Sequence, residues 1–368
     1  MGECATPLET SDWVARFQSR TMTERVPLRG MLELTSRCNL KCVHCYLGDQ
    51  EQYRAQAASE MTTDEVKALI DELVEAGTLF LTITGGDPMM RKDFVDVYRY
   101  AAQQGLLVTV YCDAILVTDK VLAAFAEYPP RQVEVSVYGA TADVYESVTR
   151  VPGSFVKAVK GIDRLIDAGV RLSLKTVLMT INAHELEGMR ELAESRGLDF
   201  RFDGAIFPCL SSGGAEEPVS LRLSAAALVK AEMSREESRL AWAERYRRMQ
   251  QEEESTGLYG CQAGQTSYYI DPKGVMSPCL MTVGYRYEKG DRNFQEVWEQ
   301  DLGRVRERER TRSTCMDGEM RGACNHCPAF NYLETGDEEE ESEYLRDLTR
   351  LRHRSIMEVL SESGDSDT

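Results

Sequence analysis

The sequence RCNLKCVHCY, residues 37–46, determines the fold class and chemistry expected of this chain. It places three cysteines, Cys38, Cys42 and Cys45, directly after an apolar segment at residues 30–34 that predicts a buried β-strand. Thiolates are soft ligands that suit iron–sulfur clusters, zinc or copper. A four-iron cubane takes four ligands and this loop offers three, so the spacing predicts a cluster with one iron open to a substrate or cofactor.

Zinc is the competing ligand for these thiols. Structural zinc sites usually use two C-x-x-C pairs, or one such pair with two distant histidines. Here the spacing is C-x3-C-x2-C, no fourth ligand lies close in sequence, and His44 would have to turn inward to serve as one. The pattern favours an iron–sulfur cluster, and a zinc loop or ordinary buried thiols are the alternatives.

The spacing C-x3-C-x2-C, with an aromatic residue before the last cysteine, resembles the radical S-adenosylmethionine (SAM) superfamily. The resemblance implies a [4Fe–4S] cluster on Cys38, Cys42 and Cys45 and an electron donated by flavodoxin or ferredoxin. It also implies cleavage of SAM to methionine and a 5′-deoxyadenosyl radical, which abstracts hydrogen from the substrate. In such an enzyme the protein orients the reactants and excludes water, while the cofactor supplies the difficult chemistry.

Length, charge and cysteine count narrow the class of protein. The chain has 368 residues, enough for one large domain and a smaller one, and a net charge of −18. Such a polyanion is not expected to bind nucleic acid. The sequence shows no membrane span and no secretory signal. Eleven cysteines, most of them in two clusters, predict metal sites in a reducing cytoplasm rather than disulfides.

Strand and helix patterns alternate from residue 25 to residue 208. The predicted strands are rich in Val, Leu, Ile, Tyr and Phe and cover residues 30–35, 79–84, 106–111, 132–138, 171–179 and 199–207. The predicted helices cover residues 63–76, 91–104, 118–127, 154–168 and 183–196. Six such units imply an α/β fold with a parallel sheet. The resemblance implies a partial (β/α)6 TIM-like barrel with its chemistry at the C-terminal ends of the strands.

The remaining segments complete the predicted domain organisation. Residues 1–25 leave no room for a fused peptide-recognition domain, so such a domain is expected on a separate protein. A long, charged helix over residues 224–254 is expected to bridge two domains. The predicted domains are the N-terminal segment 1–25, the barrel 26–210, the loop and bridging helix 211–258, a small iron–sulfur domain 259–332, and an acidic C-terminal helix and tail 333–368.

A GGDP turn follows the second predicted strand. Glycines there let the backbone approach a ligand closely, and a carboxylate can pair with an ammonium group. Beside the cysteine loop, Gly85, Gly86, Asp87 and Pro88 resemble the superfamily's GGEP motif, which holds the amino group of SAM. Asp87 replaces the usual glutamate and is one methylene shorter. The side-chain contact therefore departs from the family pattern, while a backbone contact would survive.

Further residues are expected to bind SAM. Ser136 and Arg150 lie at about the places where related enzymes bind the methionine carboxylate, and an arginine fork suits a carboxylate. A surface arginine beside a turn is the alternative for Arg150. Lys175 on the fifth predicted strand is another candidate, and the resemblance implies that Tyr46 packs near the adenine.

A second cysteine-rich segment begins at residue 259. The spacing C-x12-G-x4-C from Cys261 to Cys279 resembles the C-terminal domains called SPASM or twitch, which hold auxiliary iron–sulfur clusters. The sequence around it predicts a hairpin with a turn at residues 271–274. A full SPASM domain has further cysteines, whereas this chain has Gly318 at one such position and none after Cys327.

The five thiols of this segment can supply one four-ligand cluster but not two. The sequence therefore predicts a twitch-like domain with one auxiliary [4Fe–4S] cluster. Its expected ligands are Cys261, Cys279, Cys324 and Cys327, with Cys315 as the alternate or spare. A zinc site built from the same residues, which His326 can join, is the alternative.

The resemblance favours a radical SAM oxidoreductase or maturase that forms a crosslink, a thioether or an epimer in a ribosomally made peptide. The alternative is a small-molecule dehydrogenase or an enzyme that modifies haem or tetrapyrrole side chains. A non-enzymatic electron carrier or zinc adaptor is disfavoured, because it needs no aminoacyl pocket. The general acid or base is open, and the candidates near predicted strand ends are Cys112, Asp113, Asp203 and Cys209.

Overall fold

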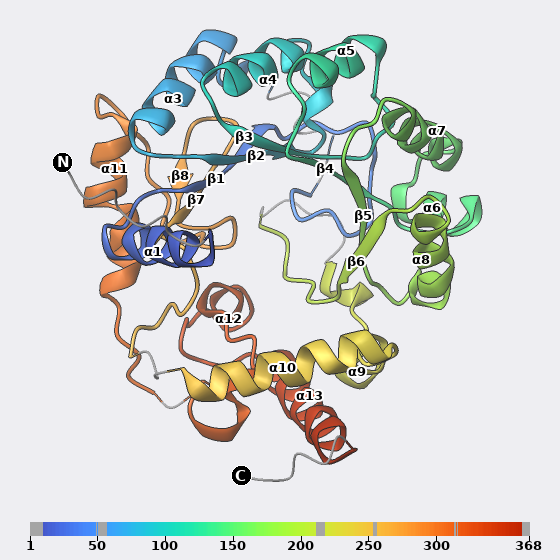
Figure 1. Ribbon diagram of the computed structural model, residues 1–368, viewed down its shortest axis with the longest axis vertical. Helices are drawn as coiled ribbons and strands as arrows, with labels where there is room; N and C mark the ends of the chain where they lie inside the picture. Colours follow the sequence, from blue (N-terminus) through green and yellow to red (C-terminus); the bar gives the residue numbers. More distant parts are fainter. Residues whose placement is uncertain are drawn as a thin grey trace, which may run out of the picture.

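A computed structural model describes residues 10–48, 50, 57–210, 218–252, 256–312, 314 and 316–362. One sheet, with the strand order β6-β5-β4-β3-β2-β1-β7-β8, curves around the middle of the molecule (Figure 1). Its first six strands pair in parallel: β1 (Arg29–Thr35), β2 (Phe80–Gly85), β3 (Leu107–Cys112), β4 (Gln132–Ser136), β5 (Leu172–Val177) and β6 (Asp199–Asp203). This arrangement confirms the predicted partial barrel.

Helices cover the convex side of these six strands (Figure 1). They are α3 (Thr63–Glu75), α4 (Phe94–Gln103), α5 (Asp119–Glu127), α6 (Ala142–Thr149), α7 (Ser154–Asp167) and α8 (Leu186–Glu194). The first of them shows why they form where they do. Thr62 and Glu65 make a reciprocal capping box at its N-terminus, and Val66 and Ile70 are fully buried on its inner face.

The two faces of the sheet have different chemistry. Residues such as Leu32, Ile83 and Val135 belong to the main apolar core. Neighbouring positions, which point to the opposite face, carry polar side chains such as Glu33 and Lys175. The barrel therefore has an apolar outside, covered by helices, and a polar inside.

The second cysteine-rich segment is joined to the barrel by the sheet itself. Its hairpin, β7 (Ser267–Ile270) and β8 (Met276–Ser277), is confirmed, and β7 pairs in parallel with β1. A Cβ on Gly30 would lie 2.4 Å from the Tyr268 hydroxyl, so glycine permits this close pairing. Phe294 and Trp298 of α11 (Phe294–Gln300) belong to the same core as the barrel.

Several helices differ from expectation. The single helix predicted over residues 224–254 is wrong: the chain forms α9 (Ala225–Glu232) and α10 (Glu236–Gln251), separated by residues 233–235. The helices α1 (Thr10–Thr23) and α6 were not predicted, and α12 (Pro328–Thr335) and α13 (Glu343–Glu362) complete the C-terminal part. Among the described helices, none has both the length and the apolar character needed to cross a bilayer.

Candidate active site

The cysteine loop follows β1 and is held between two neighbouring elements. The Gly86 N–H at the end of β2 donates to the Thr35 carbonyl at 2.8 Å. On the other side, the Lys41 N–H donates to the Thr149 carbonyl at the end of α6, at 3.0 Å. The loop is thus fixed by backbone hydrogen bonds at the C-terminal edge of the parallel strands, where the sequence predicted it.

The glycine pair of the GGDP turn lies directly against this loop. A Cβ on Gly85 would lie 2.2 Å from the Thr35 carbonyl oxygen, and one on Gly86 would lie 2.4 Å from that of Arg37. The Asp87 N–H also donates to the Arg37 carbonyl, at 2.9 Å. Only residues without a side chain permit this approach, so the two motifs form one continuous backbone surface.

Gln50 closes the cysteine loop. Its Oε1 accepts a hydrogen bond from the Cys38 N–H at 2.7 Å, and its Nε2 lies 3.9 Å from Sγ of Cys45. The side chain is only 4% exposed. Sequence analysis missed this residue, because nothing in its spacing from the cysteines distinguishes it from any other polar residue after the motif.

The donor set of the loop suits a bound group that supplies positive charge. Burial raises the pKa of the Cys38, Cys42 and Cys45 thiols, so a metal would be needed to stabilise their thiolate forms. Two buried polar atoms on the same loop, Asn39 Oδ1 and His44 Nδ1, have no hydrogen-bond partner among the described residues. Three soft thiols beside unsatisfied polar atoms fit an iron–sulfur cluster with a bound polar cofactor.

The His44 ring packs against an aromatic residue of the barrel. It lies edge-on to the ring of Tyr138, with 4.7 Å between centroids. Burial lowers its pKa to about 4, so the imidazole is neutral. Within the described residues, no three His, Cys, Asp or Glu side chains form a group that could hold a single metal ion.

Asp87 uses both carboxylate oxygens within its own chain. Oδ1 accepts from the Met89 N–H at 2.8 Å, at the start of the short 3-10 helix η2 (Pro88–Met90), and Oδ2 accepts from the Asp113 N–H at 3.0 Å. The residue is fully buried, and burial raises its pKa. The shorter acid of this GGDP motif is therefore a structural connector between the ends of β2 and β3.

Asp113 connects the same region to the cysteine loop. Its Oδ2 accepts from Asn39 Nδ2 at 2.6 Å, and its Oδ1 accepts from the Ile115 N–H at 2.8 Å. Burial, and then the neighbouring Asp87 carboxylate, raise the pKa of Asp113. Two adjacent buried carboxyl groups disfavour double ionisation, so this pair holds a proton more readily than exposed aspartates.

The predicted carboxylate-binding residues lie in different surroundings. Arg150 follows the last residue of α6 in the left-handed conformation (φ 54°), and its side chain is exposed. It comes directly after Thr149, whose carbonyl accepts a hydrogen bond from the cysteine loop.

Ser136 ends β4 and lies opposite Lys175 of β5 in register. The Lys175 ammonium is 3.3 Å from the Glu134 carboxylate and 3.0 Å from the centroid of the Tyr111 ring. Burial lowers the Lys175 pKa to about 8, against the opposing effect of Glu134.

Tyr46 is fixed by an acid that sequence analysis missed. Its hydroxyl donates to Oε1 of Glu33 at 2.6 Å, and its ring lies 6.0 Å from that of Phe207. Glu33 is buried on the inner face of β1, and burial raises its pKa to about 7, although hydrogen bonds from Tyr46 and Tyr269 oppose the rise. A carboxylate in the middle of the apolar segment GMLELT was the signal that could have identified it.

The four catalytic candidates are divided between two environments. Asp113 contacts the cysteine loop, and the Cys209 thiol donates to the Tyr46 carbonyl at 3.1 Å. Cys112 packs in the main apolar core. Asp203 is exposed at the end of β6, where its Oδ1 accepts from the backbone N–H two residues later. Asp113 and Cys209 therefore bond to the segment that carries the three cysteines.

Three cysteines of the second cysteine-rich segment lie near one another. The thiols of Cys261, Cys279 and Cys327 are close enough to influence one another, and burial, with smaller contributions from the other two, raises the Cys327 pKa to about 12. Cys324 is buried and its sulfur, which is in a disulfide, accepts from the His326 N–H at 3.1 Å. Cys315 lies outside the described residues.

Known proteins are similar to this chain in sequence and in fold. Residues 32–193 match the family described as the Radical SAM superfamily. The chain is 27% identical to the AdoMet-dependent heme synthase of Methanosarcina barkeri, over 85% of this chain and 94% of that protein. It is 29% identical to the mycofactocin maturase MftC of Mycobacterium ulcerans, over 72% of this chain and 73% of that protein. The structure of Streptococcus suis SuiB bound to SAM has a similar fold, with a TM-score of 0.66, 16% identity, and coverage of 94% of this chain and 83% of that one.

Proposed function

We propose that this chain, whose residues 32–193 match the Radical SAM superfamily, is a SAM-dependent enzyme that installs a crosslink, a thioether or an epimer in a ribosomally made peptide. One observation carries the chemical part of this proposal. The cysteine loop and the GGDP turn are joined by backbone hydrogen bonds, from Gly86 to Thr35 and from Asp87 to Arg37. An electron carrier or a zinc adaptor has no need for such a joint surface.

Each part of this surface has a proposed task. Cys38, Cys42 and Cys45 would hold a [4Fe–4S] cluster, and the three-ligand set leaves one iron for SAM. The backbone of the GGDP turn would hold the amino group of SAM, and Arg150 with Ser136 would hold its carboxylate. When bound, the [4Fe–4S] cluster and SAM would together supply the reductive cleavage of SAM and the radical that abstracts hydrogen.

The inner face of the barrel would orient the reactants. Tyr46, positioned by Glu33, would pack near the adenine, and Lys175 is a further candidate for the carboxylate. Flavodoxin or ferredoxin is the proposed electron donor, and a separate peptide-recognition protein is the proposed partner. The cytoplasm is the proposed compartment, because a reducing environment protects thiolate-bound clusters.

We assign an auxiliary [4Fe–4S] cluster to Cys261, Cys279, Cys324 and Cys327, with Cys315 as the alternate ligand. The proximity of Cys261, Cys279 and Cys327 supports this assignment. Cys324 would have to be reduced before it could bind iron. The hairpin between Cys261 and Cys279 is hydrogen-bonded to β1, the strand that leads into the cysteine loop, so both proposed clusters are attached to one sheet. A cluster there could accept the electron that the substrate loses.

Two relatives support different substrates. The similarity to a mycofactocin maturase supports a peptide. The match to a heme synthase, which extends over 94% of that protein, favours a second candidate function: modification of tetrapyrrole side chains. Both functions use the same SAM chemistry and differ in the substrate that enters the barrel.

Anaerobic reconstitution tests both levels of the proposal. The reduced protein, incubated with dithionite and SAM, is expected to form 5′-deoxyadenosine, which chromatography detects, whereas Cys42→Ala should form none. Its absence from the wild-type reaction would refute the enzyme proposal. Deuterium transfer into 5′-deoxyadenosine from a labelled short peptide encoded beside the gene would support peptide modification. Transfer from labelled iron-coproporphyrin III instead would support the second candidate.

A further inference from the structure

Within the part of the chain that the structure describes, one edge of strand β6 pairs with no other strand. The strand is the outermost of the sheet and bonds on one side to β5, where the Leu178 N–H donates to the Asp203 carbonyl at 2.7 Å. Successive residues of a strand direct their backbone groups to alternate sides. The N–H and C=O groups of Phe200 and Phe202 therefore point to the free edge. Such an edge is a template for an added strand.

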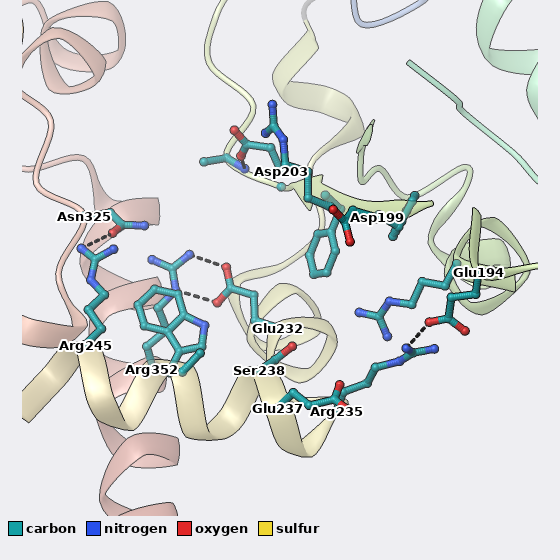
Figure 2. A pocket seen from close by; sticks show the side chains of 18 of the residues that line it. Glu194, Asp199, Asp203, Glu232, Arg235, Glu237, Ser238, Arg245, Asn325 and Arg352 are labelled. Atoms are coloured by element: carbon teal, nitrogen blue, oxygen red, sulfur yellow. Dashed lines mark hydrogen bonds and ion pairs between the residues drawn. The ribbon is translucent and has the colours of Figure 1, made fainter. Parts of the chain in front are cut away.

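A cavity of about 680 Å³ follows this edge. Every residue from 198 to 205 lines it, so the whole strand borders the space. Ser238, Trp242 and Arg245 of α10 line it as well (Figure 2). The cavity thus lies between the strand edge and a helix face, and a five-residue strand of roughly 17 Å would extend along its length.

The charges in the cavity favour a basic ligand. Four of its arginines pair with carboxylates of the protein, as in the Arg352–Glu232 pair at 2.6 Å, and Arg245 bonds to the uncharged Asn325 at 3.0 Å (Figure 2). Three exposed acids that line the cavity form no ion pair within the part of the chain that the structure describes: Asp199, Asp203 and Glu237. These carboxylates outnumber the single arginine without a carboxylate partner.

The strand also leads toward the cysteine loop. After β6 the chain continues through residues 204–210, and the Leu210 N–H donates to the Tyr46 carbonyl at 3.0 Å. The C-terminal end of β6 is therefore tied to the loop that carries the three cysteines. A peptide extended beside β6 has one end directed to the same side of the barrel.

We propose that the free edge of β6 binds an extended, basic segment of the peptide substrate as an added strand, an inference that rests on the proposed peptide-modifying function. Phe200 and Phe202 supply main-chain hydrogen bonds, which give affinity with little dependence on sequence. Asp199 and Asp203, four residues apart on one face of β6, select lysine or arginine at matching positions of the added strand. The bound segment sets which downstream residue reaches the cysteine loop.

Fluorescence anisotropy with the full, reconstituted chain tests this binding mode. The probe is the peptide GKTVTKTG-amide with fluorescein on its N-terminal amine, which places its two free lysines four residues apart. Asp199→Lys with Asp203→Lys should weaken binding at least tenfold, and so should Ala241→Trp, which fills the cavity from α10 without changing the strand. Glu191→Lys, an exposed site on α8 outside the cavity, is the matched control and should bind like the wild type. Equal binding by all four proteins would overturn the proposal.

N-methylated probes separate strand addition from simple charge attraction. Methyl groups on the amides of one edge of the peptide should abolish binding, whereas methyl groups on the other edge should be tolerated. Equal effects of the two methylation patterns would exclude strand addition. Iron-coproporphyrin III that displaces the probe from the wild type but fails to bind Ala241→Trp would assign the cavity to a tetrapyrrole and overturn the inference.

One measurement separates failure of this inference from failure of the proposed function. Formation of 5′-deoxyadenosine without peptide is measured in the same wild-type preparation. If SAM is cleaved but the probe does not bind, the assignment of the β6 edge fails alone. If SAM is not cleaved, the proposed function fails as well.

Discussion

Oδ2 of Asp87 accepts a hydrogen bond from the backbone N–H of Asp113 at 3.0 Å, and this contact joins the GGDP turn to the end of β3. Asp113 in turn accepts from Asn39 on the cysteine loop. Three consecutive strand ends, those of β1, β2 and β3, are therefore connected through two buried carboxyl groups. In this GGDP turn the Asp87 side chain accepts two backbone N–H groups and so organises the neighbouring backbone.

This relationship predicts that Asp87→Asn destabilises the protein itself. Both oxygens of Asp87 accept backbone N–H groups, so an amide would direct its NH₂ group against one of them. Leaving a buried donor unsatisfied should lower the free energy of unfolding by roughly 1–3 kcal/mol. Chemical denaturation measures the change, with exposed Asp291→Asn as the control. Unchanged stability with weaker SAM binding would instead mean that Asp87 contacts the cofactor directly.

Glu33→Gln should flatten the pH dependence of stability. Burial raises the Glu33 pKa from 4.5 to about 7, so the folded protein keeps a proton that the unfolded chain releases over this interval. The bound proton stabilises the folded protein fully below about pH 4.5. As the pH rises from there through 7, the free energy of unfolding falls by roughly 3 kcal/mol. Denaturation curves at several pH values should show this extra loss in the wild type and in the control Glu191→Gln, but not in Glu33→Gln. Parallel curves for all three proteins would contradict the burial of an acid at this position.

Gly86→Ala should push the GGDP turn away from the cysteine loop. The added Cβ would lie 2.4 Å from the Arg37 carbonyl oxygen, a contact that only a backbone shift can relieve. We expect loss of 5′-deoxyadenosine formation by at least tenfold, with the iron content maintained. Gly284→Ala is the matched control, because a Cβ there meets nothing within 4 Å. Full activity of Gly86→Ala would show that the close approach is not needed.

Cys279→Ala should remove about half of the iron. The wild-type chain is expected to bind about eight irons, four in each of two cubanes, and the variant about four. Iron and sulfide analysis after anaerobic reconstitution measures this, and Cys112→Ala, a thiol in the apolar core, serves as the control. A wild-type content near four irons would show that the chain holds one cluster and no auxiliary cluster.

Local sequence patterns predicted the barrel because each strand and helix there has its own apolar periodicity. The six strands and the capping of α3 at Thr62 follow from such patterns. The break between α9 and α10 was not predictable, because residues 233–235 contain neither Gly nor Pro. The pairing of β7 with β1 joins segments more than 200 residues apart, and no local pattern encodes it.

The candidate site likewise combines residues that local sequence patterns predict with residues that only tertiary contacts reveal. The cysteines and the GGDP turn were predictable from their spacing, whereas Gln50, Glu33 and Asn39 act through contacts that only the folded chain creates. The acidic run at residues 337–341 lies just before α13. Within it, Glu338 is buried and accepts from the Tyr259 hydroxyl at 2.7 Å, a tertiary contact that no local pattern predicts.

Electron paramagnetic resonance of the anaerobic, dithionite-reduced protein, recorded with and without SAM, tests whether one iron of the cysteine-bound cluster binds SAM. We expect a reduced [4Fe–4S] signal that changes when SAM is added, because three cysteine ligands leave one iron for the cofactor. The triple variant Cys38→Ala, Cys42→Ala and Cys45→Ala should lose this change and keep only the auxiliary signal. A wild-type spectrum that SAM leaves unchanged would contradict the account.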